Sequence, residues 1–376
     1  MTFIVFFILL FTAQAHSANA ESEAEAFGVS FTNATINRDT TAMAELFDLN
    51  AFTDKAANLA FTKQSDINDF KEGFLSNFEM PAVFMDQIMN ELFKNQFNTK
   101  YLGVVDGRPL IRFDYESGGH EYMFLLLKQG VSKPVIAEDL FFLTNGKVYS
   151  KVIAGVVQMA IKPSESMLKR LFDIKDINTD ITESISQIMK LVSENSYQQA
   201  YDLLEALPEE VKTTRYIIDI GVQISGAIND DLYEEQLSRL DKYYGNDPST
   251  SFSLIDYHFL KKDYAKAVKT VGVLQRNLGN DAALESMVAS IYFESGDMVL
   301  AKQHVLKAIE IETDFENSYW ILANITNATK SYDETVAALT QLEKNFGYEF
   351  TSDDIAREPS YDQLIKSQAF KDWINQ

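Results

Sequence analysis

The residues best suited to acid–base chemistry lie in the first half of the chain. His120 follows Gly118-Gly119 and precedes Glu121 at the start of an expected strand. A histidine beside a carboxylate can act as a general base with a pKa near neutrality. A hairpin turn whose polar side chains are simply solvated explains the same residues, and we favour this plainer interpretation.

Two further acids, Glu138 and Asp139, lie on a later expected strand. Because neighbouring side chains on a strand point to opposite faces, at most one of them can enter a pocket. A lone carboxylate in an apolar pocket can do acid–base work with a raised pKa. More often such a residue pairs with a nearby base, here Arg108 or Arg112. A pocket that holds His120, Glu138 and Arg112 is therefore one hypothesis for this part of the chain.

Other catalytic and metal-binding patterns are missing from the sequence. The 376 residues include no cysteine, which excludes disulfides, cysteine-ligated metals and thiol catalysis. His258 and His304 have no second histidine at helical spacing, and no H-E-x-x-H, calcium-loop, P-loop or G-x-S-x-G pattern occurs. We therefore expect no metal, no cofactor and no enzymatic activity, with the N-terminal part as the open case.

The charge balance limits the class of partner. Acidic residues outnumber basic ones 55 to 33, a net charge of -22, so phosphate backbones would repel the chain and nucleic acid is not expected as a partner. The acidity is greatest in residues 161–376, with 36 acids and 21 bases, against 19 and 12 in residues 21–160. This part of the chain therefore favours basic or amphipathic partners.

An internal repeat with a step of 34 residues runs through the C-terminal part. Small residues recur in register at Ala267, Ala301 and Thr335. Other positions keep the same step: Tyr264, Met298 and Tyr332; Val271, Val305 and Leu339; Ile220, Leu254, Val288 and Leu322. Within each unit, apolar residues three and four apart predict two helices joined by a short turn. Such a hairpin cannot bury its apolar face alone and must stack on its neighbours.

This repeat resembles the tetratricopeptide repeat family. The unit Ala282–Thr313 carries a large residue, a glycine and two alanines where the family expects them, at Tyr292, Gly296, Ala301 and Ala308. It departs from the family at Thr313, where proline is usual. The resemblance implies five helical hairpins over residues 181–347. It also implies an amphipathic cap in the tail 358–376, built on Leu364, Phe370, Trp373 and Ile374.

The resemblance further implies a groove, because in this family the first helix of each unit forms the inner surface. Carried over, that surface consists of Phe252, Asp256 and Phe259, then Ser286, Ser290 and Phe293, then Trp320, Asn324 and Asn327. Aromatic rings can bury the side chains of an extended peptide or helix while amides bind its backbone. The phenylalanines could equally pack between helices, whereas one of Tyr319 and Trp320 should face the groove. The basic residues of the family's carboxylate clamp are missing.

The N-terminal part predicts helices first and strands afterwards. Phenylalanines at helical spacing predict helices up to residue 97, and Asp39 is placed to cap one of them. Beyond residue 100, β-branched and aromatic runs between glycine turns predict strands at 101–105, 110–115, 122–127, 135–143 and 148–157. This order, with Glu138-Asp139, resembles the cone-shaped fold of nuclear-transport-factor-2-like proteins. The predicted fold class is mainly α: an α+β domain over 21–165, then a tetratricopeptide-type α-solenoid over 166–376.

The first 20 residues predict an export signal. A nine-residue apolar run at 3–11 is followed by A-x-A patterns at Ala13–Ala15 and Ala18–Ala20, although no Lys or Arg precedes the run. The run is shorter than the roughly 20 residues that span a bilayer, and no later stretch approaches that length. We expect no integral membrane segment after cleavage. An exported chain without cysteine suits the periplasm.

Two functions of different class remain open. The first is a non-enzymatic periplasmic scaffold or adaptor that binds a protein or peptide in the groove of the repeats. The alternative is an N-terminal domain that binds a small molecule or acts as an enzyme, with the repeats serving to localise it.

The export signal predicts the start of the mature protein. N-terminal sequencing of the protein from a periplasmic fraction should find His16 or Glu21 as the first residue. Retention of Met1 in that fraction would contradict the predicted cleavage.

Overall fold

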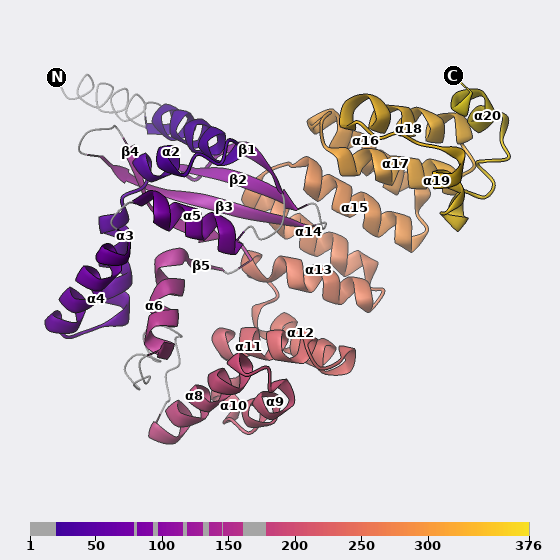
Figure 1. Ribbon diagram of the computed structural model, residues 1–376. Helices are drawn as coiled ribbons and strands as arrows, with labels where there is room; N and C mark the ends of the chain where they lie inside the picture. The colour runs from indigo at the N-terminus through magenta and orange to yellow at the C-terminus, as the bar shows by residue number, and fades with distance from the viewer. Residues whose placement is uncertain are drawn as a thin grey trace, which may run out of the picture. The chain divides into compact units, whose positions relative to one another are not determined.

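The computed structural model describes residues 20–78, 81–92, 97–115, 119–130, 135–144, 146–160 and 178–375 (Figure 1). The chain divides into two compact units, Met1–Thr250 and Ser251–Gln376, and each is described by itself. Residues 1–19 of the predicted signal and the predicted domain boundary at 165 lie outside the described residues.

The first unit opens with helices that precede an antiparallel sheet. The helices are a segment at 20–36, α2 (Thr40–Glu45), α3 (Leu49–Ala60), α4 (Gln64–Asn77) and α5 (Pro81–Leu92). The side chain of Asp39 accepts a hydrogen bond from the amide of Ala42 and so caps α2, as predicted. The strands are β1 (Phe97–Val105), β2 (Arg108–Tyr115), β3 (His120–Gln129), β4 (Val135–Phe142) and the short β5 (Lys147–Val148), which pair in that order.

One face of the sheet packs on the helices and forms the first core. Ile111 and Phe113 of β2 and Met123 and Leu125 of β3 are buried there, because alternate residues of a strand share a face. The helices contribute mainly phenylalanine to the same core: Phe27, Phe31, Phe52 and Phe84. Helices followed by an antiparallel sheet confirm the predicted α+β order.

The prediction of a fifth long strand at 148–157 is wrong, because most of this segment forms helix α6 (Tyr149–Ala160). The physical reason is a contact from another element. Asp139 of β4 accepts hydrogen bonds from the backbone amide and the hydroxyl of Ser150, at 3.1 and 2.5 Å. A carboxylate that binds amides of the first turn stabilises a helix N-terminus, and here it outweighs the strand preference of the valines.

Helical hairpins follow, and the first two belong to the first unit. They are α8 (Thr179–Ser193) with α9 (Tyr197–Glu205), and α11 (Arg215–Gly226) with α12 (Asp230–Tyr244), with α10 (Glu209–Lys212) between them and the 3-10 helix η1 (Pro248–Thr250) after them. Ile188, Leu204 and Ile217 of these hairpins share a core with Ala60 of α3 and Ala154 of α6. The first repeats and the sheet domain are therefore packed into one compact unit.

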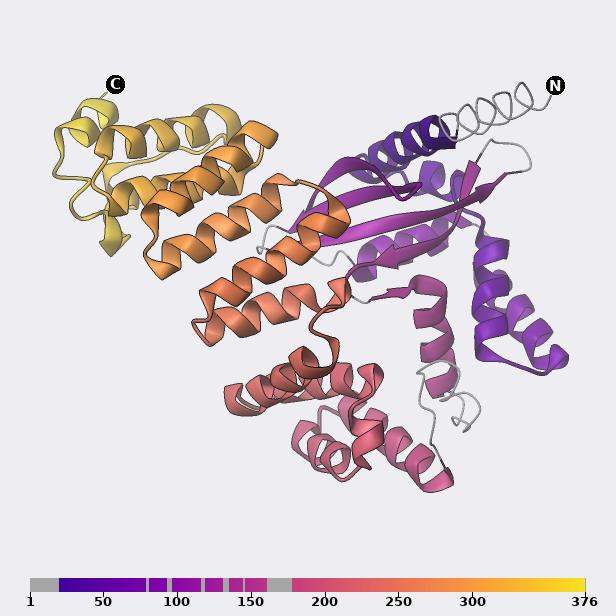
Figure 2. The same ribbon diagram turned by 180° about the vertical axis from the view of Figure 1, so that it is seen from behind.

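The second unit holds three hairpins and the C-terminal tail, which Figure 2 shows from behind. The hairpins are α13 (Ser251–Leu260) with α14 (Tyr264–Leu278), α15 (Ala282–Ser295) with α16 (Met298–Ile311), and α17 (Glu316–Ala328) with α18 (Tyr332–Phe346). The predicted turn between α15 and α16 is confirmed. Gly296 has a left-handed backbone with φ of 85°, and the Asp297 side chain accepts from the amide of Leu300.

The repeat register is confirmed by burial. Ala267, Ala301 and Thr335 each have 0% exposed surface, and each lies on the second helix of its hairpin. The tail continues with α19 (Ser352–Ala356), the 3-10 helix η2 (Pro359–Tyr361) and α20 (Gln368–Ile374). Leu364 and Phe370 of the tail are buried against the last hairpin, so the predicted cap is present.

The tight crossing at Ala301 leads to a stability prediction. In Ala301→Leu, the added methylenes have no space, so the free energy of unfolding should fall by about 1–3 kcal/mol. Chemical denaturation of the full chain measures this loss. Ala337→Leu, on the exposed face of α18, is the matched control and should change little. Equal stabilities of the two variants would mean that the helices do not cross closely at Ala301.

Candidate functional site

Arg112, Asp114 and His120 form a polar cluster on β2 and β3. The guanidinium of Arg112 donates to both carboxylate oxygens of Asp114, at 2.8 and 2.9 Å, and Nδ1 of His120 lies 2.7 Å from Asp114 Oδ1. Burial alone would raise the pKa of Asp114. The hydrogen bond to His120 and the charge of Arg112 outweigh it and hold that pKa below its usual value.

The cluster has the geometry of a structural network. Arg112 has 0% exposed surface and His120 11% on its side chain, so the arginine offers nothing to a ligand from solvent. The third member of the predicted pocket, Glu138, lies elsewhere and forms an ion pair with Lys55 of α3 at 2.8 Å. The structure therefore brings His120 and Arg112 together through Asp114, which sequence reasoning missed, and leaves Glu138 apart.

The predicted groove residues lie on α13, α15 and α17, the first helices of the hairpins in the second unit. Ser286 is completely buried, with its hydroxyl 2.9 Å from that of Ser318 on α17, so it joins two helices. Asp256 and Phe259 are exposed, and Phe252 and Ser290 are half-buried. The remaining four line one pocket: Phe293, Trp320, Asn324 and Asn327.

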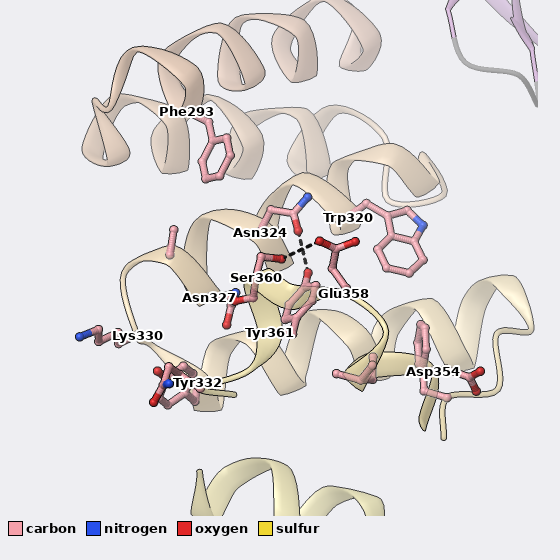
Figure 3. Close-up of a pocket in the computed structure, with 14 residues that line it drawn as sticks. Phe293, Trp320, Asn324, Asn327, Lys330, Tyr332, Asp354, Glu358, Ser360 and Tyr361 are labelled. Atoms are coloured by element: carbon pink, nitrogen blue, oxygen red, sulfur yellow. Dashed lines mark hydrogen bonds between the residues drawn. The ribbon is translucent and has the colours of Figure 1, made fainter. Parts of the chain in front are cut away.

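This pocket has a volume of about 770 Å³ and lies within the second unit (Figure 3). Repeat helices form one side of it. The other side comes from the tail, which sequence reasoning treated only as a cap: Phe350, Asp354, Ile355, Glu358, Ser360, Tyr361 and Gln363. Tyr319 is buried beside the pocket while Trp320 lines it, which agrees with the expectation that one of the pair faces the groove.

The tail binds the two groove amides of the last repeat. Asn327 donates from Nδ2 to the backbone carbonyl of Ser360 at 2.9 Å. Asn324 accepts from the hydroxyl of Tyr361 at 2.7 Å, which Figure 3 marks with a dashed line. Burial raises the pKa of Tyr361 to about 12, which keeps this hydroxyl a donor at neutral pH. The chain thus places one of its own carbonyl groups where the family resemblance implies the backbone of a peptide.

Aromatic rings from the tail also cover part of Trp320. Tyr348 and Phe350 approach its indole edge-to-face at centroid distances of 5.2 and 5.7 Å, and they stack on each other. The indole nitrogen donates to Glu316 at 3.1 Å. Trp320 remains half-buried and lines the pocket, so part of its ring is accessible to a ligand.

The sequence also contains a signal that the tail continues the repeat. Ala369 lies 34 residues after Thr335, and Trp373 lies 34 after Leu339, so the tail continues the repeat step. Its first helix is short, because α19 ends at Ala356 and Pro359 begins η2. The tail is therefore a degenerate sixth unit whose broken first helix forms the pocket wall.

Metal-binding clusters and membrane-spanning helices are both absent from the described residues. No group of three His, Asp or Glu side chains is placed there to hold a metal ion. In that same part of the chain, no helix combines the length and the apolar character needed to cross a bilayer.

The hairpins repeat with a 34-residue step and cross at buried small residues. This array is an α-solenoid whose 34-residue helical hairpins resemble tetratricopeptide repeats. No protein-family model matches the chain, and no curated protein sequence matches it.

Solved structures give likenesses over about half of the chain. PilW, described as a widely conserved type IV pilus biogenesis factor, is 11% identical with a TM-score of 0.38, covering 52% of this chain and 91% of its own. Pseudomonas aeruginosa PilF is 10% identical with a TM-score of 0.36, covering 51% and 86%. YrrB, described as a tetratricopeptide repeat protein with an unusual peptide-binding site, is 11% identical with a TM-score of 0.31, covering 50% and 89%. At such scores the likenesses carry no argument about function.

The polar cluster of the sheet yields a stability prediction. Asp114→Asn leaves the buried guanidinium of Arg112 without its carboxylate and should lower the free energy of unfolding by about 3 kcal/mol at pH 7. Because folding lowers the pKa of Asp114, its contribution is complete above about pH 4 and is lost as the pH falls further. Urea denaturation at pH 7 and pH 3 measures both effects.

The matched control is Asp54→Asn, which removes one member of an exposed ion pair with Lys71 and should cost little. A variant Asp114→Asn as stable as the control would argue against a structural role for the cluster and for a binding role.

Proposed function

We propose that this chain is an exported, non-enzymatic adaptor whose repeat array binds a basic or amphipathic peptide segment of another protein. The observation that carries this proposal is the pocket between α15, α17 and the tail, with Trp320 as its aromatic anchor. Tryptophan in a pocket of this kind often contributes a large share of the binding free energy of an interface.

The size and lining of the pocket support a peptide as the ligand. About 770 Å³ is room for several side chains, and ligand pockets in proteins span a similar range. Phe293 and Trp320 offer apolar surface, while Lys330 and Gln363 offer polar groups at its edge. Since the tail already engages the amides of Asn324 and Asn327, a partner would be held chiefly through the rings.

Charge supports a basic partner. Residues 310–376, which include most of the pocket lining, carry 13 acidic and 5 basic residues. Within the described lining, the charged residues are two acids, Asp354 and Glu358, and one cation, Lys330. Such a surface attracts a basic segment and speeds its association at low ionic strength.

Export to the periplasm is part of the same proposal and rests on the apolar run at residues 3–11. A nuclear-transport-factor-2-like fold for the first domain stays a prediction. A ligand-binding or enzymatic role for that domain remains the alternative function. It has less support, because Arg112 is fully buried and bound to Asp114.

Trp320 provides the test of the proposed function. A library of displayed peptides selected on the folded full chain should yield binders rich in Lys or Arg beside an apolar residue. Trp320→Ala should weaken the selected peptides at least about 30-fold, the equivalent of roughly 2 kcal/mol, by fluorescence anisotropy. The variant should stay folded, because the ring is only half-buried and truncation should cost about 1–2 kcal/mol.

Leu306→Ala is the matched control, since this exposed leucine of α16 lies outside the pocket lining, and peptide affinity should be unchanged. Peptides that bind Trp320→Ala as well as the intact chain would place the partner surface elsewhere and overturn the proposal. Loss of folding in Trp320→Ala would mean that the ring acts mainly in core packing.

A further inference from the structure

A basic surface lies on α14 in this otherwise acidic chain. Residues 257–280 carry five basic residues and one acidic residue, whereas the whole chain has a net charge of -22. Four of the cations are exposed on or just before α14: Lys262, Lys266, Lys269 and Arg276. We call these four residues the α14 basic stripe.

The stripe lies on one side of the helix. On α14 itself, Lys266, Lys269 and Arg276 are spaced three and seven residues apart, a spacing that returns to the same helical face, and Lys262 lies in the turn just before the helix. The buried residues Ala267, Val271 and Leu274 occupy the opposite face, which packs in the repeat array. At about 1.5 Å per residue, the part of the stripe from Lys266 to Arg276 extends roughly 15 Å along the helix.

The cations of the stripe form few ion pairs within the described part of the chain. Among the described residues, Lys266 is the one member of the stripe with an ion-pair partner, which is Asp263 at 3.3 Å. Cations on other second helices are paired across helices: Arg239 with Glu205, Lys302 with Glu334 and Lys307 with Glu285. Lys262, Lys269 and Arg276 are therefore exposed to solvent, although the chain has 55 acidic residues.

Two large apolar side chains lie next to the stripe in the chain. Leu260 is 60% exposed and Phe259 is 36% exposed, at the end of α13 and just before Lys262. The turn that follows them has Lys262 in a left-handed backbone with φ of 55°. Exposed apolar residues beside lysines are typical of segments that bind the interface of a bilayer, where rings and aliphatic chains enter and cations stay at the headgroups.

We propose that the α14 basic stripe, with Leu260, docks this protein on an anionic phospholipid surface. The exposed Leu260 beside these cations favours lipid over an acidic protein, because an apolar side chain can enter the bilayer interface while lysines stay at the anionic headgroups. The net negative charge of the chain does not prevent this contact. At physiological salt, charges more than about 8 Å away are largely screened, so the stripe dominates where it touches.

The test is flotation of the full chain with lipid vesicles. Vesicles of phosphatidylglycerol and phosphatidylcholine in equal amounts should carry the protein at about 50 mM salt, and phosphatidylcholine alone should not. Replacing Lys262, Lys266, Lys269 and Arg276 by Gln should weaken the binding at least tenfold. Leu260→Ser should weaken it several-fold, whereas Leu306→Ser, an exposed leucine on α16, should not.

A charge-matched control separates the stripe from net charge. Replacing Lys190, Lys344, Lys366 and Lys371 by Gln changes the net charge equally and should leave vesicle binding intact, because all four are exposed and lie outside both the stripe and the pocket lining. Equal losses in the two quadruple variants, or no binding of the intact chain to the anionic vesicles, would overturn the proposal. So would stripe-dependent binding to poly-L-glutamate that exceeds binding to the vesicles, because that result assigns the stripe to an acidic protein. Circular dichroism melts verify that every variant is folded.

Discussion

The repeat array depends on the close approach of the two helices in each hairpin. Ala267, Ala301 and Thr335 have no exposed surface, and each allows the second helix of its hairpin to pack tightly. The hairpin that results still has an apolar face, so each one needs a neighbour to cover it. The array must therefore be closed at its end, and the closing element has to meet an apolar surface.

The tail closes the array with the same kinds of contact that a partner would use. It buries Leu364 and Phe370 against the last hairpin, and it also places the Ser360 carbonyl on Asn327 and aromatic rings on Trp320. A complete sixth unit would present another full first helix, but Pro359 interrupts that helix and leaves a hollow beside it. The pocket is thus a consequence of how the solenoid ends.

Periodic features could be predicted from the sequence because they depend on residues near one another in the chain. The 34-residue step predicted the hairpins and their crossing residues, the amphipathic tail and the family resemblance predicted the cap, and the pair Tyr319-Trp320 predicted one ring at the surface. The predictions were wrong where the local structure depends on a residue far away in the sequence. Asp139 accepts a hydrogen bond from the amide of Ser150 and so stabilises a helix in a valine-rich segment. Glu138 forms an ion pair with Lys55 and not a pocket with His120. Neither pairing has a signature in the local sequence.

Net charge was a poor guide to local surfaces for a related reason. The total of -22 averages over α14, where cations gather on one face, and over residues 310–376, where acids outnumber bases 13 to 5. In a solenoid the first and second helices of the hairpins form different surfaces of the array. One surface can therefore be acidic while another is basic. Long-range attraction is screened within about 8 Å at physiological salt, and recognition is then decided by the charges that touch the partner. An acidic pocket lining and a basic helix face in one array can therefore serve two different ligands.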